Sequence, residues 1–130
     1  MQKTNKIFML LILILSTTFS CAKEKEITIN LTVPDTTWQI TIDDVYIVEN
    51  ELWVISTVSQ NPDLMGAQVI SKIQASVKLA APDLPVKHFV LGKSWHWEND
   101  EPCIFIQDIK QIEKDLKSAR HIYMAGKSEQ

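Results

Sequence analysis

Glycine is scarce in this sequence, with only three residues among 130, and the glycine-dependent motifs of common enzyme families are missing. There is no Gly-x-Ser-x-Gly nucleophile elbow, no P-loop and no Gly-x-Gly-x-x-Gly fingerprint. The acidic pairs that acid–base chemistry would use, such as Asp43-Asp44, Glu49/Glu51 and Glu98/Asp100, all fall in predicted turns, where carboxylates are common. The sequence therefore favours a non-catalytic protein without a cofactor, and a small enzyme is the weakest alternative.

An excess of basic residues is also missing. The chain has 13 Lys and Arg against 16 Asp and Glu. If Lys3 and Lys6 are removed with an N-terminal signal, 11 basic residues remain against 16 acidic ones, a net charge of −5. Because binding to phosphate backbones needs clustered Lys and Arg, this balance argues against DNA or RNA as a partner.

Cysteine occurs only twice, at Cys21 and Cys103. If Cys21 is lipidated it cannot pair, and Cys103 is then expected to be a buried structural thiol. If Cys21 stays unmodified, a Cys21–Cys103 bridge would tie the N-terminal segment to the domain. The order His88, Cys103, His121, Met124 is that of blue-copper sites, but seventeen residues separate Cys103 from His121, too many for such a loop, so we expect no metal site.

The first 21 residues are typical of a secretory signal peptide. Lys3 and Lys6 precede an apolar run from Ile7 to Leu15, which is too short to span a bilayer. Cys21 follows the small residue Ser20, as in the lipobox of bacterial lipoproteins, although Thr18 stands where leucine is usual. We therefore expect lipidation of Cys21, a tether over residues 22–26, and a location in the cell envelope as an outer-membrane or periplasmic lipoprotein. Cleavage after Ala22, giving a soluble secreted protein, is the alternative.

Alternation of apolar and polar residues predicts strands through most of the mature chain. The clearest case is Ile27 to Val33, and the clearest hairpin joins 45–48 to 52–58 across Glu49-Asn50-Glu51. Further strands are predicted over 38–42, 67–73, 76–79, 86–91 and 93–97. This pattern predicts a mainly β domain over residues 27–125, an antiparallel β-sandwich or small barrel.

One helix is predicted near the C-terminus. Asp108 is a suitable N-cap, and apolar residues recur at spacings of three and four after it. The resulting stripe consists of Ile109, Ile112, Leu116 and Ala119. A last short strand is expected over Arg120 to Met124, followed by a frayed tail over residues 126–130.

The middle of the chain follows a recognisable rhythm of strands and turns. Its members are Trp38, Ile42 to Val45, Leu52 to Ile55, Asn61-Pro62, Gln68 to Ile70, Asp83 to Val86 and Phe89-Val90. This layout resembles the C-terminal immunoglobulin-like domain of PrcB-type protease-complex-associated bacterial lipoproteins, over roughly half of the mature chain. The resemblance implies an accessory protein that binds or stabilises an envelope protease, and it carries over no functional residue. The Trp-rich segment and the terminal helix depart from that family.

The segment from Gly92 to Glu98 holds the most concentrated side-chain chemistry. On an extended strand, Trp95 and Trp97 would share one face with Lys93, while His96 and Glu98 would lie on the other. Such a tryptophan pair would suit a protein partner or a sugar ring, since Trp is enriched at binding hot spots. The other interpretation is that both rings fill the core. The candidate binding residues are Lys93, Trp95, His96, Trp97 and Glu98, with an envelope or extracellular protein, or a cell-wall glycan, as partner.

Overall fold

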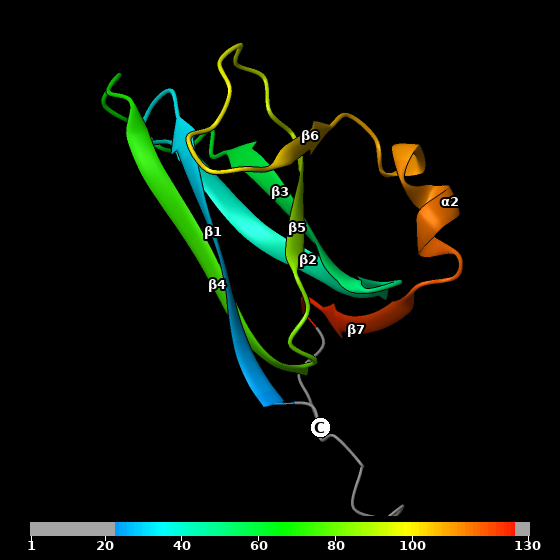
Figure 1. Ribbon diagram of the computed structural model, residues 1–130. Helices are drawn as coiled ribbons and strands as arrows, with labels where there is room; N and C mark the ends of the chain where they lie inside the picture. The colour runs from blue at the N-terminus through cyan, green and yellow to red at the C-terminus, as the bar shows by residue number, and fades with distance from the viewer. Residues whose placement is uncertain (1–22, 127–130) are drawn as a thin grey trace, which may run out of the picture.

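The structure, a computed structural model, describes residues 23–126 (Figure 1). The predicted signal peptide over residues 1–21, with Cys21, and the end of the predicted frayed tail lie outside the described residues. The strands are β1 (Lys23–Val33), β2 (Trp38–Val48), β3 (Glu51–Gln60), β4 (Ser71–Ala81), β5 (Val86–Leu91), β6 (Ile104–Ile106) and β7 (Arg120–Met124). Two short helical segments, η1 (Ile109–Gln111) and α2 (Glu113–Leu116), lie between β6 and β7. In this part of the chain, no helix is long and apolar enough to cross a membrane.

The strands form two sheets of unequal size. A small sheet contains β1 and β4, paired antiparallel, and a large sheet has the order β6-β5-β3-β2-β7. The small sheet lies across one face of the large one (Figure 1). The prediction of a mainly β, sandwich-like fold with one C-terminal helix is confirmed.

The main core lies between the two sheets. The period-two pattern of β1 turns four apolar side chains inward, and fully burying each contributes about 1.5–3 kcal/mol. These side chains are Ile27, Ile29, Leu31 and Val33. The central strand β3 meets them with Leu52, Val54 and Val58.

A second core lies on the opposite face of the large sheet. Trp53 and Ile55 of β3 pack there with Phe89 of β5, under Ile112 of the helical segment. Asp108 caps this segment as predicted, since its Oδ1 accepts a hydrogen bond of 3.0 Å from the Lys110 N–H and the Gln111 side chain completes a capping box. Within the predicted apolar stripe, Ile109 is exposed because η1 is a single 3₁₀ turn, whose side-chain spacing differs from that of an α-helix.

Several predicted elements differ in detail. The β3–β5 and β5–β6 pairs are parallel, so the large sheet is mixed rather than purely antiparallel. The segment 93–97 is not a strand, and β4 begins only at Ser71, so that residues 67–70 belong to a loop instead of a strand. β1 begins at Lys23, so residues 23–26, expected in a tether, are paired with β4.

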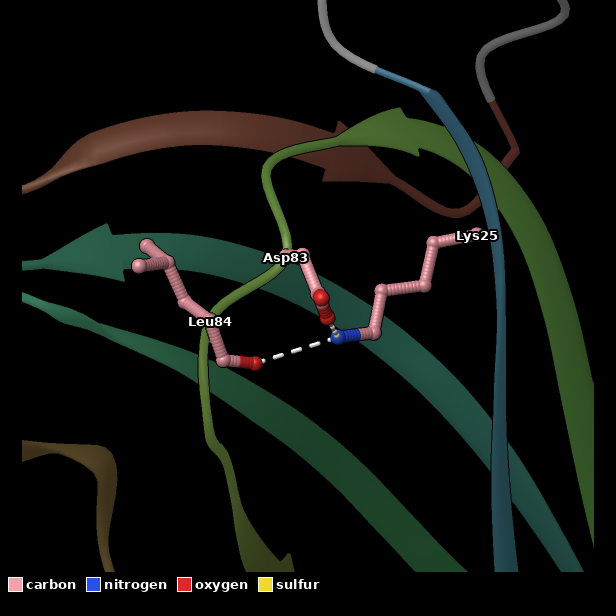
Figure 2. Close-up of polar contacts among 3 residues, drawn as sticks. All are labelled: Lys25, Asp83 and Leu84. Carbon is pink, nitrogen blue, oxygen red and sulfur yellow. Dashed lines mark hydrogen bonds and ion pairs between the residues drawn. The ribbon is translucent and has the colours of Figure 1, made fainter.

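The N-terminal end of β1 is held to the loop between β4 and β5. The Lys25 ammonium donates a hydrogen bond of 3.0 Å to the Leu84 carbonyl and lies 3.4 Å from the Asp83 carboxylate (Figure 2). Asp83 is fully exposed, so solvent screens the ion pair and the bond to the carbonyl matters more.

Candidate functional site

The Trp-rich segment is part of the long loop 92–103, which joins β5 to β6. Gly92 stands at its start with φ +98°, and a Cβ at this position would lie 2.2 Å from the Val58 carbonyl oxygen. Only glycine adopts this conformation so close to a neighbouring backbone. The chain therefore turns away from the sheet at Gly92, which ends the alternation of side chains that an extended strand would impose.

Trp95 is a core residue. Its side chain is buried, with 8% of the residue exposed, and packs in the main core. Its indole meets Trp38 edge to face, with ring centres 5.2 Å apart. Of the two interpretations of the tryptophan pair, core filling therefore holds for Trp95, and Trp95 is not among the directly accessible binding residues.

Trp97 is the exposed member of the pair. It is 38% exposed, and its ring centre lies 6.0 Å from that of Trp95. His96 and Glu98 beside it are exposed. Lys93 is half-buried, and its Nζ lies 4.5 Å from the ring centre of Phe105 in a cation–π contact. Of the five predicted binding residues, Trp97, His96 and Glu98 are thus accessible to a partner.

A second exposed segment, the loop 61–70, was not predicted as a binding site. Its apolar side chains point into solvent, and Met65 has a relative exposure of 103%. The exposed apolar residues of this loop are Leu64, Met65, Val69 and Ile70. The turn Asn61-Pro62-Asp63 before these residues could have indicated an exposed loop. The β-forming character of Val69 and Ile70 favoured a strand instead.

The loop 61–70 is held at its middle. The Ala67 N–H donates a hydrogen bond of 2.9 Å to Thr36 Oγ1, and the Thr36 N–H donates one of 3.3 Å to the Ala67 carbonyl. Gly66 fits closely against the same turn, since a Cβ there would lie 2.5 Å from the side chains of Thr36 and Thr37. The apolar side chains are therefore displayed on an anchored loop.

Three loops gather at one end of the sandwich, which we call the distal end: 34–37, 61–70 and 92–103 (Figure 1). β1 begins at the other end (Figure 1). The distal end displays Trp97 and the apolar residues of the loop 61–70. Exposed apolar side chains that gather on one loop are typical of a site for a macromolecular partner.

Loop 92–103 is fastened to β1 by Asn99. Its Oδ1 accepts a hydrogen bond of 2.9 Å from the Thr32 N–H, and its Nδ2 donates one of 3.0 Å to the Asn30 carbonyl. The Asn30 side chain in turn donates to the Glu101 carboxylate at 3.1 Å. A cavity of about 300 Å³ lies beside this contact and is lined by polar groups that include Lys72 and Asp100.

Two titratable groups lie beneath this loop. Burial lowers the pKa of His88, while the nearby Glu101 carboxylate acts in the opposite direction. Burial raises the pKa of the half-buried Cys103 thiol, and a hydrogen bond to Asn99 partly offsets this effect. A thiol with a raised pKa is a poor nucleophile and a poor metal ligand at neutral pH.

Histidine and carboxylate also meet at the opposite edge of the large sheet. His121 Nε2 lies 2.9 Å from Asp44 Oδ1, and the imidazole stacks on Tyr46 with ring centres 4.4 Å apart. This pair joins β7 to β2. Across residues 23–126, no three His, Cys, Asp or Glu side chains are grouped so that they could hold a metal ion.

No protein-family model, curated protein or solved structure matches this chain.

Proposed function

We propose that this protein is a non-catalytic binding or accessory domain of the cell envelope that contacts a protein partner through its distal end. The observation that carries the proposal is the display of Leu64, Met65, Val69 and Ile70 on an anchored loop at the same end as Trp97. Exposing such side chains disfavours solubility, and a partner that covers them recovers the free energy of burial.

The position of β1 supports this orientation. The strand has 11 residues, which at about 3.3 Å each is roughly 36 Å. Lys23 starts the strand only two positions after Cys21, the proposed lipidation site. A lipid on Cys21 would therefore hold one end of the domain at the membrane and direct the distal end away from it.

A protein partner is favoured over a glycan, the second candidate. A sugar platform needs exposed aromatic faces, and the burial of Trp95 leaves Trp97 as the exposed ring of the pair. The aliphatic side chains of the loop 61–70 suit a protein surface better than a carbohydrate. The resemblance to PrcB-type lipoproteins is compatible with a protease as the partner, in an accessory or inhibitor-like role.

Site-specific photocrosslinking tests the proposal. A photoreactive residue is placed at Met65, at Trp97 or, as a control, at the exposed Lys114 of α2, in the full chain with its native signal in its own host. We expect one discrete protein adduct from Met65 and Trp97 and none from Lys114. The partner identified from the adduct should then bind the purified protein, with at least about tenfold weaker affinity for Met65→Asp.

A different result would contradict the proposal. Equal adducts from all three positions would indicate random contact. Retention of the domain on purified peptidoglycan, lost with Trp97→Ala and accompanied by no protein adduct, would establish the glycan function instead. The intact mass of the mature protein tests the anchor separately, because acyl chains on Cys21 add to the mass and cleavage after Ala22 removes that residue.

A further inference from the structure

The sandwich is open along one side. Two strands of the small sheet face five strands of the large one. β4 packs over β2, and residues 99–101, which lead into β6, bond to β1. The edge of β1 that faces away from β4 therefore lies on the side of β5 and β6. Along that edge, β1 pairs with no further strand among residues 23–126.

The backbone of β1 presents alternate residues to this edge. The Thr32 N–H and the Asn30 carbonyl point away from β4, since both bond to Asn99. By the two-residue repeat of an antiparallel ladder, the N–H and carbonyl groups of Thr28 and Glu26 point the same way. Lys25, whose side chain reaches the Leu84 carbonyl, marks the N-terminal limit of this stretch (Figure 2).

Asn99 already imitates the next strand. One side-chain amide accepts from one backbone N–H of β1 and donates to the carbonyl two residues away. In an added parallel strand the N–H and carbonyl of one residue would make the same pair of bonds, and in an added antiparallel strand two residues would supply them. This edge can therefore bond to amide groups. The Asn99 side chain occupies the Thr32 N–H and the Asn30 carbonyl, and it does not reach the backbone groups of Thr28 and Glu26.

Incompletely covered side chains lie on this side, in β6 and in the loops that lead into β5 and β6. Phe105, Cys103 and Leu84 contact the main core but are only partly buried. His88 Nδ1 is buried without a hydrogen-bond partner among the described residues. A third strand beside β1 would lie over this region, and its inward side chains would cover these groups.

We propose that the edge of β1 from Glu26 to Asn30 accepts an extended segment of a partner polypeptide as a third strand of the small sheet. Main-chain hydrogen bonds supply the affinity in this mode, and alternate side chains supply the specificity. The segment has apolar residues at every second position, facing Phe105 and Leu84, and polar residues between them. This surface lies on the side of the sandwich and is independent of the proposed contact at the distal end.

Peptide selection followed by amide hydrogen exchange tests this proposal. A displayed library of random 12-residue peptides is selected against the purified full chain, and exchange is measured for each amide with and without the selected peptide. We expect the amides of Glu26 and Thr28 to exchange at least about tenfold more slowly with peptide bound, because each gains a hydrogen bond.

Two substitutions at one position provide the matched pair. Thr28→Pro removes the edge N–H and should weaken the peptide at least about tenfold, whereas Thr28→Ala keeps the N–H and should stay within about threefold. If Thr28→Pro unfolds, the exchange measured on the unsubstituted chain decides. The proposal is overturned if no peptide is selected, if protection falls on loops 61–70 and 92–98 instead, or if the β1 amides become protected by raising the protein concentration alone, which would indicate pairing between copies.

Discussion

The indole rings of Trp38 and Trp95 meet edge to face, with their centres 5.2 Å apart. Trp38 begins β2 and Trp95 lies in the loop 92–103, so this contact fixes the loop to the large sheet at the distal end. Trp97 then lies outside Trp95 with its ring partly in solvent. Trp95 is thus structural, whereas Trp97 is accessible to a partner.

The two tryptophans should respond differently to truncation. Trp95→Ala removes a buried ring from the main core and should lower the free energy of unfolding by about 3–5 kcal/mol. Trp97→Ala removes a partly exposed ring and should cost about 1 kcal/mol or less. Urea unfolding of both variants measures the difference, and equal costs would mean that the two rings are equally buried.

Gly92 should tolerate no side chain. Gly92→Ala forces a Cβ against the Val58 carbonyl at a φ of +98°, and we expect a loss of at least about 2 kcal/mol. Gly126 is the matched control, since its φ is +81° but no atom lies within 4 Å of the added Cβ. Gly126→Ala should therefore cost about 1 kcal/mol. Thermal unfolding compares the two, and a smaller effect at Gly92 would contradict this account of the loop.

Burial of His88 should make the stability fall in mild acid. Because burial lowers the pKa of His88 in the folded chain, the unfolded chain, with the ordinary pKa of 6.5, takes up the proton first. The neutral folded form is therefore fully favoured above pH 6.5, and stability decreases as the pH falls from 6.5 toward the lowered folded pKa. Replacing the ring with His88→Leu should flatten this part of the melting temperature profile.

The exposed His96 provides the control for this experiment. His96→Gln should leave the dependence on pH as it is in the unsubstituted chain. If His88→Leu and the unsubstituted protein lose stability equally between pH 7 and pH 5, the decline arises from other groups.

The contributions of the two hydrogen bonds between Asn99 and β1 can be separated by substitution. Asn99→Ala loses both, and should cost about 1–3 kcal/mol. Asn99→Asp keeps the acceptor for the Thr32 N–H but loses the donor to the Asn30 carbonyl, and it adds a carboxylate near Glu101. We expect it to be no more stable than Asn99→Ala at pH 7 and to recover at low pH, where a protonated carboxyl can donate. Equal unfolding free energies for all three chains would show that the loop is held by other contacts.

Side-chain alternation was enough to predict the β elements whose apolar face meets the core. β1 followed its period-two pattern from Ile27 to Val33, and the hairpin around Glu49 was placed correctly. The interruption expected at Asp43-Asp44, between the predicted strands 38–42 and 45–48, is a bulge within the single strand β2, since the register of β2 and β3 shifts between Ile42 and Asp44. In each case the local pattern and the tertiary packing agree.

Pairing between distant strands was not predictable in the same way. The side chains of a strand alternate between the two faces of a sheet whether its neighbour runs parallel or antiparallel. The pattern of β5 therefore does not reveal its parallel pairing with β3. The apolar residues at Val69 and Ile70 favoured a strand, but they lie outside the paired part of β4. The candidate site was missed there because β propensity measures the fit to a sheet and not the presence of a neighbouring strand.

The pairing of β1 with β4 also determines the order in which the chain can fold. Partners in this pair are separated by 38 positions at Val33 and Ser71 and by 58 positions at Lys23 and Ala81. Closing such long loops costs entropy before any contact repays it, which makes folding slow. β1 must therefore wait, unpaired, until β4 has left the ribosome. Glu24, Lys25 and Glu26 would help to keep the waiting strand from pairing with other chains.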